Sequence, residues 1–441
     1  MMNRFYYVLS WICLLAYQSC VFSTDLSADI ETDYNYLDSL FKHFHSNPEL
    51  SFVEYKTSAR LAEELRRAGA VVTEQVGGTG VVGILENGPG PTVLVRADMD
   101  ALPLEEKSGL AYASRVTQTD IDGKKFPVMH ACGHDVNMTS LVGFARQIQK
   151  RRDDWSGTLV LIGQPAEERL GGARKMIEDG LYERFPRPDY ALALHVASLM
   201  EAGKLRLEPG ITYSSSDSID IIVPGVGAHG AAPQLGKDPV VIASQIVMAL
   251  QTIVAREVSP FDPAVVTVGS FHSGTKHNII SDQAKLQLTV RSNDAEVRDK
   301  LLAAIKRIAE NIGRVAGLPE DNLPLVTPPL ASTPPTMNDP VLVKRLSGVF
   351  EQSFGEDVMV RRPRIGMGAE DFAYFLNVDP PVPGAYFSVG GTTREAFLEA
   401  QEKGERIAGH HSPLFKIHPK SSITRGVHAM TVAVLELMGG D

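Results

Sequence analysis

The stretch TVLVRADMD, residues 92–100, joins a short apolar run to three charged side chains. Two later segments have the same texture, TLVLIGQP at 158–165 and YALALHV at 190–196. Unbroken apolar runs of this length are typical of strands that are buried on both faces of a parallel sheet. Helical patterns over 139–151 and 172–181 separate the runs. This alternation predicts an α/β domain with a mostly parallel sheet flanked by helices.

The pattern changes in the middle of the chain. SIDIIVPG (218–225) and KLQLTVRS (285–292) alternate apolar and polar residues, and AVVTVGSF (264–271) is typical of a third strand. Two long helical patterns cover 238–257 and 294–317. The order βαββα predicts a small antiparallel sheet with helices on one face, a ferredoxin-like arrangement.

The two textures together indicate one domain interrupted by another. The proline-rich segment LPLVTPPLASTPPT (323–336) is typical of a linker, and the α/β texture resumes after it. We therefore expect the α/β domain to cover 24–214 and 326–441, with the inserted domain at 215–325.

Charge and composition exclude some classes of partner. The 441 residues carry a formal net charge of -10, and no run of Lys or Arg occurs. These features argue against nucleic-acid binding. No segment after the N-terminus reaches spanning length without charges, so we expect no integral membrane segment in the mature chain.

The N-terminus has the features of a signal peptide. Arg4 supplies a short positive region, and residues 5–17 form an apolar stretch too short to span a bilayer. We expect residues 1–23 to be removed and the protein to be secreted or periplasmic. AYQSC offers Cys20 as an alternative site of lipid anchoring, although it matches a lipobox poorly.

The segment VMHACGHDVN (128–137) is the first candidate site. Cys132 and His134 flank Gly133, and the other two cysteines lie in or at the edge of the predicted signal peptide. Two ligands at this spacing converge on one ion only where the backbone bends, and a glycine permits that bend. The alternative is a buried, inert thiol beside a hydrogen-bonded histidine.

The segment QPAEER (164–169) directly follows an apolar strand, where α/β folds place ligands. Side chains of the adjacent Glu167 and Glu168 point in different directions. One can therefore bind a metal while the other faces a water as general base. The alternative is a pair of acids placed at a helix N-terminus by the helix dipole.

Histidines supply two further candidates. His195 ends the apolar run YALALH, and HHSPLF (410–415) lies in a loop near the end of the chain. Residue chemistry alone does not choose between His410 and His411. A backbone-bonded histidine and an exposed loop pair are the alternatives.

The four segments together supply Cys, His, Glu, His and His. This mixed set suits Zn²⁺ or Mn²⁺ and exceeds what one tetrahedral ion needs. A two-metal hydrolytic site with a bridging water accounts for the surplus and for the spare carboxylate.

Ordered motifs along the chain resemble a known family, the amidohydrolase branch of the co-catalytic metallopeptidases. That branch includes hippurate hydrolases, plant IAA-amino-acid hydrolases, aminoacylase-like carboxypeptidases and N-acetyl-diaminopimelate deacetylases. The resemblance runs from about residue 38 to the end. The motifs are SNPELSFVEYKTS (46–58), RADMDALP (96–103), MHACGHD, QPAEE, LHV, GAHGAAP (227–233), KHNII (276–280), GAEDF (368–372) and HHSPLF.

The resemblance assigns roles residue by residue. It implies two divalent metal ions per subunit, Zn or Mn, with Co or Ni as substitutes. Glu167 matches the general base, and Asp100 matches the acid that orients the site from behind. The implied metal ligands are Cys132, His134, Glu168, His195 and His411.

The inserted domain resembles the family's lid and dimerisation domain, which implies a homodimer. His229 matches the histidine that reaches the partner subunit's site and helps to hold the tetrahedral oxyanion. Asn278 matches a polar group that grips the acyl or carboxylate end of the substrate. Asn137 departs from the pattern, because a histidine is common at that position.

Three functions remain open at this stage. The first is an exported, metal-dependent amidohydrolase that cleaves the amide bond of N-acyl or N-aroyl amino acids through a metal-bridging water. The second is a dipeptidase or carboxypeptidase acting on short peptides. The third is a non-catalytic metal- or solute-binding relative. Glu167 argues against the third, because a binding protein needs no general base.

Overall fold

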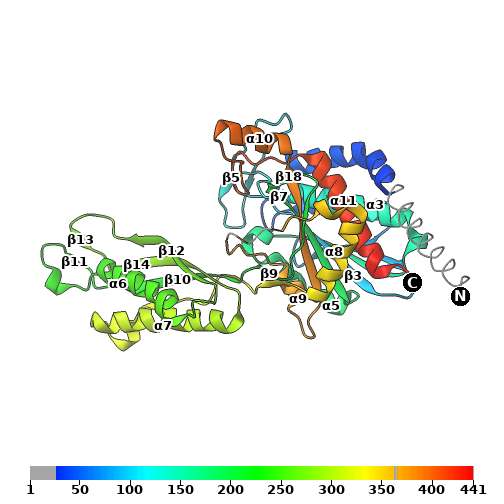
Figure 1. Ribbon diagram of the computed structural model, residues 1–441. Helices are drawn as coiled ribbons and strands as arrows, with labels where there is room; N and C mark the ends of the chain where they lie inside the picture. The colour runs from blue at the N-terminus through cyan, green and yellow to red at the C-terminus, as the bar shows by residue number, and fades with distance from the viewer. Residues whose placement is uncertain (1–25, 362–363, 365, 441) are drawn as a thin grey trace, which may run out of the picture. The chain divides into compact units, whose positions relative to one another are not determined.

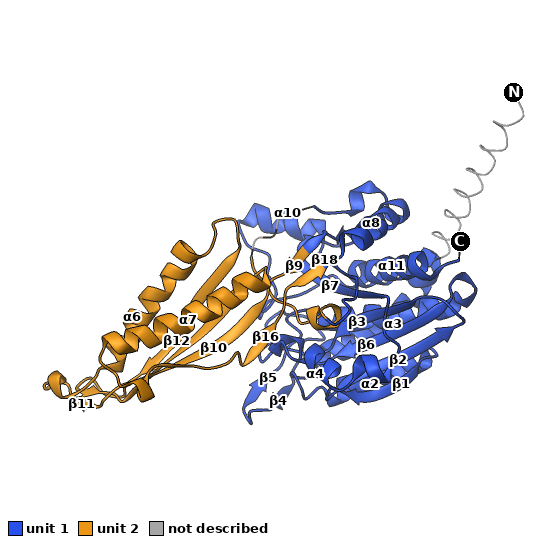
Figure 2. Ribbon diagram, turned by 90° about the horizontal axis from the view of Figure 1, so that it is seen from below, with its two compact units in different colours: residues 1–210, 338–362, 378–441 blue, residues 211–337, 363–377 orange. Residues whose placement is uncertain are grey.

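The computed structural model describes residues 26–361, 364 and 366–440, and its described part divides into two compact units (Figure 2). Unit 1 comprises Met1–Gly210, Asn338–Arg362 and Val378–Asp441. Unit 2 comprises Ile211–Met337 and Pro363–Asn377. The predicted signal peptide lies outside the described residues.

The sheet of unit 1 has seven strands in the order β1-β2-β6-β3-β7-β18-β8. Strand β3 pairs in parallel with both β6 and β7, and β7 pairs in parallel with β18. The pairs at the two edges are antiparallel. The predicted α/β fold with a mostly parallel sheet is therefore confirmed. The strands are β1 (Val71–Val76), β2 (Gly80–Asn87), β3 (Thr92–Asp98), β6 (Gly157–Gln164), β7 (Tyr190–Glu201), β8 (Leu205–Arg206) and β18 (Gly384–Thr392).

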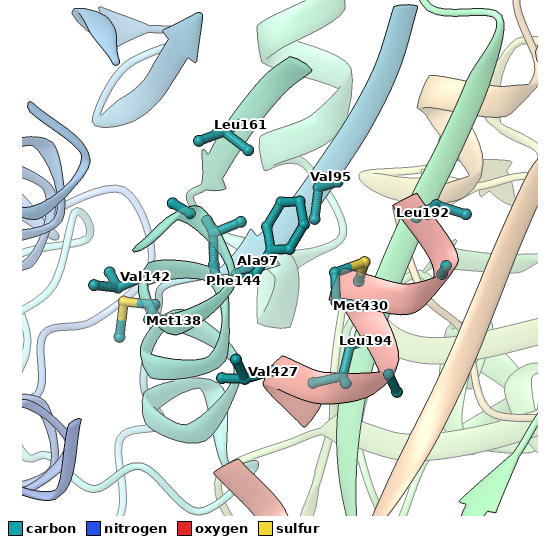
Figure 3. Packing of buried hydrophobic residues seen from close by; sticks show 14 of the residues in the cluster. Val95, Ala97, Met138, Val142, Phe144, Leu161, Leu192, Leu194, Val427 and Met430 are labelled. Carbon is teal, nitrogen blue, oxygen red and sulfur yellow. The ribbon is translucent and has the colours of Figure 1, made fainter. Parts of the chain in front are cut away.

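Helices α3 and α11 lie side by side against this sheet (Figures 1 and 3). Figure 3 shows side chains of α3 and α11, such as Phe144 and Met430, among Val95 of β3 and Leu192 of β7. A first helix covers residues 26–46. The other helices of unit 1 are α2 (Tyr55–Arg67), α3 (His134–Lys150), α4 (Gly172–Glu178), α5 (Leu181–Arg184), α8 (Pro340–Phe354), α10 (Arg394–Lys403) and α11 (Pro419–Met438).

Because β6, β3 and β7 are parallel neighbours, their carboxyl ends lie along one edge of the sheet. Asp100 follows the end of β3, and Glu167 and Glu168 follow the end of β6. The fold thus brings together side chains that are far apart in the sequence.

Unit 2 is built as β10 (Ser216–Pro224), α6 (Pro239–Thr252), β12 (Ala264–Ser273), β14 (Gln283–Ser292) and α7 (Ala295–Val315). The sheet order is β12-β14-β10-β15, and all of its pairs are antiparallel. The predicted βαββα arrangement is confirmed. Its core is a separate apolar cluster that includes Ile221, Ile246 and Leu286.

The proline-rich segment that the sequence places in a linker contributes edge strands to unit 2. Strands β15 (Leu325–Val326) and β16 (Ala331–Thr333) both pair with β10. Prolines beside these short strands fit an edge, where a missing N–H leaves no ladder bond unmade. Residues 363–377 also group with unit 2, where the Gly368 carbonyl accepts from the Ser214 N–H at 2.8 Å.

One helix among the described residues has the length and hydropathy of a membrane span. This helix is Pro239–Glu257. Its most apolar 18-residue stretch has a mean hydropathy of 1.5, and 33% of that stretch is buried. Ile242, Ile246 and Leu250 on this helix pack into the core of unit 2. Val241 and Met248 on the same helix are exposed.

Candidate metal centre

Cys132 and His134 are positioned by the start of α3. The residue between them, Gly133, has φ 86° and precedes the first helical residue. A Cβ at Gly133 would lie 2.3 Å from Cγ1 of Val196 on β7. The left-handed backbone and the close approach of β7 both require glycine here. The predicted bend between the two candidate ligands is therefore present.

The two adjacent glutamates lie on a short helical turn, Glu167–Arg169, that follows β6. Ala166 and Leu170 bracket the turn with φ 49° and 50°, which is unusual for residues other than glycine. Such a conformation costs free energy and persists only where the surroundings hold it in place.

Two buried carboxylates hold this turn. Asp100 accepts the backbone N–H of Glu167 at 3.1 Å and that of Glu168 at 3.0 Å. Glu54 accepts the N–H of Ala166 at 2.8 Å. Asp100 thus lies behind the glutamates and orients their backbone.

His195 lies inside β7, and the strand continues beyond it to Glu201. The expectation that His195 ends its strand is wrong, because β7 remains paired with β18 past this point. The pairing with β3 stops at Ala193, however, and the register places His195 level with Asp98, the last residue of β3. Nδ1 of His195 lies 2.7 Å from the Val196 carbonyl, and Nε2 lies 3.6 Å from Sγ of Cys132.

The structure distinguishes His410 from His411. His410 is engaged by protein groups at both nitrogens. Nδ1 lies 3.2 Å from the Cys132 carbonyl, and Nε2 accepts the Ser198 N–H at 3.3 Å. Burial, then repulsion from His195 and His411, lowers the pKa of His410 to about 3.

His411 instead points toward the glutamates. Its backbone has φ 63°, and its N–H donates to the Ala131 carbonyl at 2.8 Å. Its Nε2 lies 3.3 Å from Oε2 of Glu168. The imidazole is 56% exposed, so this side of the cluster is open to solvent.

The centre is rich in negative charge. Burial, then the nearby Glu168 and Glu167 carboxylates, raises the pKa of the Cys132 thiol well above its usual value. Burial alone would lower the pKa of His134, but Asp98 and Asp100 outweigh it and raise that pKa to about 10. A divalent cation would reverse this balance, because its charge favours a thiolate and a neutral imidazole.

Two buried polar atoms at the centre also lack hydrogen-bond partners among the described residues. They are Nε2 of His134 and Oε1 of Glu168, which lie 4.0 Å apart. Buried polar atoms are normally satisfied, so this pair indicates a bound group.

The donor atoms that unit 1 supplies around this point form three overlapping groups, each within 4.8 Å. Together they offer sulfur, nitrogen and oxygen donors, which fit Zn²⁺ or a similar ion. The groups are Cys132, His134 and His195; Cys132, Glu168 and His411; and His134, Glu167 and Glu168.

The remaining two predicted site residues lie in unit 2. His229 belongs to β11 (Ala228–His229) and Asn278 directly precedes β13 (Ile279–Ile280), and these two short strands pair. The Asn278 carbonyl accepts the Gly230 N–H at 2.9 Å. The side chain of His229 is exposed, and its Nδ1 accepts the Ala231 N–H at 3.0 Å.

Sequence reasoning did not assign a role to Asp98, whose carboxylate lies 3.7 Å from Nε2 of His134. Asp98 is fully buried and pairs with Arg96 at 2.7 Å. The alternation in RADMD could have indicated this pair, because residues two apart in a strand, such as Arg96 and Asp98, lie on the same face. Asn137, the departure from the family pattern, donates to Asp98 at 2.7 Å and accepts the Val196 N–H at 3.0 Å. Its amide therefore links α3 to β3 and β7.

An α/β unit that gathers these donors at the carboxyl edge of its sheet defines a metal-dependent hydrolase. The family model for peptidase family M20/M25/M40 matches residues 94–403, and the chain belongs to this family. The sequence-based resemblance is thereby confirmed.

Known relatives cover most of the chain. Hippurate hydrolase of Campylobacter jejuni is 40% identical over 76% of this chain and 83% of its own length. Thermostable carboxypeptidase 2 of Saccharolobus solfataricus is 39% identical over 83% of this chain and 88% of its own. The solved structure of the Bacillus subtilis YXEP protein, a dinuclear metal-binding peptidase of the M20 family, has a TM-score of 0.71 at 26% identity. The match covers 92% of this chain and 100% of that one.

Proposed function

We propose that this hydrolase cleaves the amide bond of N-acyl or N-aroyl amino acids at a centre that holds two divalent metal ions. The observation that carries the proposal is the strained Glu167–Arg169 turn, which directs two adjacent carboxylates to one donor cluster. The similarity to hippurate hydrolase supports an N-aroyl amino acid as substrate.

The chemistry of the centre divides between the ions and the protein. Five residues would hold the ions: Cys132, His134, Glu168, His195 and His411. The ions, when bound, supply a Lewis acid for the substrate carbonyl and make a water more acidic. We propose Zn²⁺ or Mn²⁺, with Co²⁺ or Ni²⁺ as substitutes, because the donor set mixes sulfur, nitrogen and oxygen.

Glu167 acts as the general base. It takes a proton from the water whose oxygen bonds to the amide carbon, and it then delivers that proton to the leaving nitrogen as the C–N bond breaks. Asp100 fixes the backbone of Glu167 and so keeps the carboxylate in place. His229 donates a hydrogen bond to the developing oxyanion, and Asn278 binds the substrate.

Substitution of the two glutamates tests these assignments. Glu167→Gln should retain metal and lose turnover by about 10²–10⁴-fold, because an amide cannot accept the proton. Glu168→Gln, the matched neighbour, should instead lower metal occupancy. Metal analysis and kcat are measured on both variants. Full metal with kcat within a few-fold of wild type in Glu167→Gln would remove Glu167 from the mechanism.

A second candidate function is a dipeptidase or carboxypeptidase activity on short peptides. The similarity to thermostable carboxypeptidase 2 favours it. A panel of N-acetyl amino acids, N-benzoyl amino acids and dipeptides, assayed with added Mn²⁺, Zn²⁺ or Co²⁺, separates the two functions. No turnover on any of them with full metal would favour a binding protein.

We propose that the enzyme is a homodimer joined through unit 2. Helix α6 exposes Val241 (53%) and Met248 (72%), and β12 is an edge strand of its sheet. Exposed apolar side chains on a helix beside an open sheet edge suit a second copy of the chain. Met248→Lys should weaken the dimer in analytical ultracentrifugation, whereas Leu398→Lys on α10 should not. An unchanged dimer in Met248→Lys would exclude this face.

His229 is proposed to act across that dimer. His229→Ala should depress kcat by roughly 10²–10³-fold with metal intact. Mixing inactive His229→Ala with inactive Glu167→Gln under subunit exchange should restore activity, since one site regains both groups. His272→Ala, which alters an exposed histidine of the same unit, is the control. No recovery after verified exchange would exclude action in trans.

We also propose that the protein is exported after removal of residues 1–23. The positive charge of Arg4 and the apolar stretch at residues 5–17 support export. Fractionation followed by intact-mass measurement should find a chain beginning at residue 24 outside the cytoplasm. A mass that includes a lipid on Cys20 would instead show anchoring, and a full-length cytoplasmic chain would refute export.

A further inference from the structure

Unit 1 contains a cavity, and none of the residues that line it belongs to the metal centre. Its volume is about 850 Å³. Its walls are the first helix (26–46), the end of α8, the turn after β7 and the first half of α11. Helices α8 and α11 lie next to each other in Figure 1.

Arg425 of α11 brings a positive charge to this cavity. Its guanidinium carbon lies 4.1 Å from the centroid of the Phe354 ring. No carboxylate among the described residues pairs with Arg425, and burial lowers its pKa. The carboxylate in the cavity wall, Glu31, is already bound by Lys420.

His428 lies one helical turn after Arg425 and is only 6% exposed. Its Nδ1 lies 3.4 Å from the Ser27 hydroxyl, and its Nε2 is buried without a hydrogen-bond partner among the described residues. Burial, then the positive charges of Arg425 and Arg151, lowers the pKa of His428 to about 4. The ring is therefore neutral at neutral pH.

The Ser27 contact is compatible with a His428 tautomer that carries its proton on Nε2. If the Ser27 hydroxyl donates to Nδ1, then Nε2 carries the proton and is a hydrogen-bond donor without an acceptor. Among the described residues, the cavity thus combines a guanidinium without a counter-ion and a buried imidazole nitrogen without a hydrogen-bond partner. An anionic acceptor satisfies both groups when Nε2 carries the proton.

The remaining surface of the cavity selects among anions. The Phe354 ring contributes apolar area, and the volume greatly exceeds that of an inorganic ion. We propose that this cavity binds a small organic carboxylate, with the carboxylate on Arg425 and His428 and the apolar part against Phe354. The site is independent of the proposed catalytic function.

Binding to the metal-loaded full chain tests the proposal, with benzoate as the organic probe and inorganic phosphate as the comparison. Calorimetry measures affinity, and the imidazole NMR signals of His428 report on this cavity separately from any benzoate at the metal centre. Benzoate should shift the His428 signals and phosphate should not. Comparable binding of phosphate there would overturn the assignment to an organic carboxylate.

Arg425→Met keeps an unbranched side chain beside Phe354 but removes the charge. It should weaken benzoate binding at His428 at least tenfold, since hydrogen bonds to charged groups are among the strongest. Arg187→Met, which alters an arginine stacked on Tyr182 outside the cavity, is the matched control and should leave binding unchanged.

His428→Gln provides a second variant that does not depend on how Arg425→Met folds. Its weakened binding is followed by calorimetry at the site that remains when the metal centre is blocked by a substrate analogue that cannot be hydrolysed. Benzoate binding of wild-type strength in either folded variant would refute the proposal.

Discussion

Replacing Gly133 by alanine isolates the bend that brings Cys132 and His134 together. The substitution has two costs that the structure separates. Gly133 has φ 86°, and a left-handed conformation costs a residue with a Cβ about 1–2 kcal/mol. The new methyl carbon would also lie 2.3 Å from Cγ1 of Val196, and overpacking of this kind costs about 1–3 kcal/mol. We therefore expect Gly133→Ala to lower the free energy of unfolding by about 2–5 kcal/mol.

Gly123→Ala is the matched control. Gly123 also has a positive φ, 78°, but a Cβ there meets nothing within 4 Å. It should cost only the conformational part, about 1–2 kcal/mol. Urea unfolding of both variants gives the difference, which is the cost of the contact with Val196.

Metal content provides an independent measurement on the same pair. Relief of the contact between the added methyl group and Val196 would move the start of α3, and with it the Cys132 and His134 donors. Metal occupancy should therefore fall in Gly133→Ala and stay at the wild-type value in Gly123→Ala. Equal stability losses and equal metal content in the two variants would refute the role of this glycine.

Three further predictions follow from single groups. Bound metal should protect Cys132 from alkylation and a chelator should remove this protection, because a thiolate that coordinates a metal cannot react. Equal labelling of the folded protein with and without chelator would indicate a merely buried thiol. Burial alone would lower the pKa of His45, but Asp135 and Glu106 raise it to about 9. A rise from 6.5 to about 9 corresponds to roughly 3 kcal/mol, fully present below about pH 6.5 and lost as the pH rises toward 9. Wild type should therefore lose more stability than His45→Gln between pH 6.5 and 9 in urea unfolding, and parallel curves would contradict this. Asn137→Ala should lower metal affinity about 10–100-fold, because the Asp98 carboxylate loses the hydrogen bond from the Asn137 amide. Titration with a competing chelator measures the affinity, and a wild-type value would contradict the prediction.

Apolar runs in the sequence predicted the central strands of the sheet in unit 1. The three segments that open with threonine or tyrosine and continue in Val, Leu, Ile or Ala are the adjacent strands β3, β6 and β7. Buried parallel strands need apolar residues on both faces, so their sequences are unambiguous. The proline-rich stretch gave no such signal. Its short strands β15 and β16 pair only at an edge, and edge pairing leaves no periodic pattern in so few residues.

Residue types indicated which kinds of donor atom the centre could offer, whereas its geometry depends on the backbone. Residue type could not separate His410 from His411, because both are loop histidines. The two residues differ in the structure because His411 has a left-handed backbone, with φ 63°, and because His410 accepts a hydrogen bond from the Ser198 N–H. Neither feature has a signature in the sequence HHSPLF.

The same distinction explains why Glu54 escaped notice. It stands in ELSFVEYKT, where an acid just before a helix is usually a solvent-exposed residue favoured by the helix dipole. Instead it is fully buried, and burial together with the Asp100 carboxylate raises its pKa. Its oxygen accepts the N–H of Ala166, the residue whose left-handed backbone opens the Glu167–Arg169 turn. A buried acid next to another acid is costly, and a strained turn is costly too. Each stabilises the other, because the turn supplies the donors that the carboxylates need and the carboxylates hold the turn that aims Glu167 and Glu168.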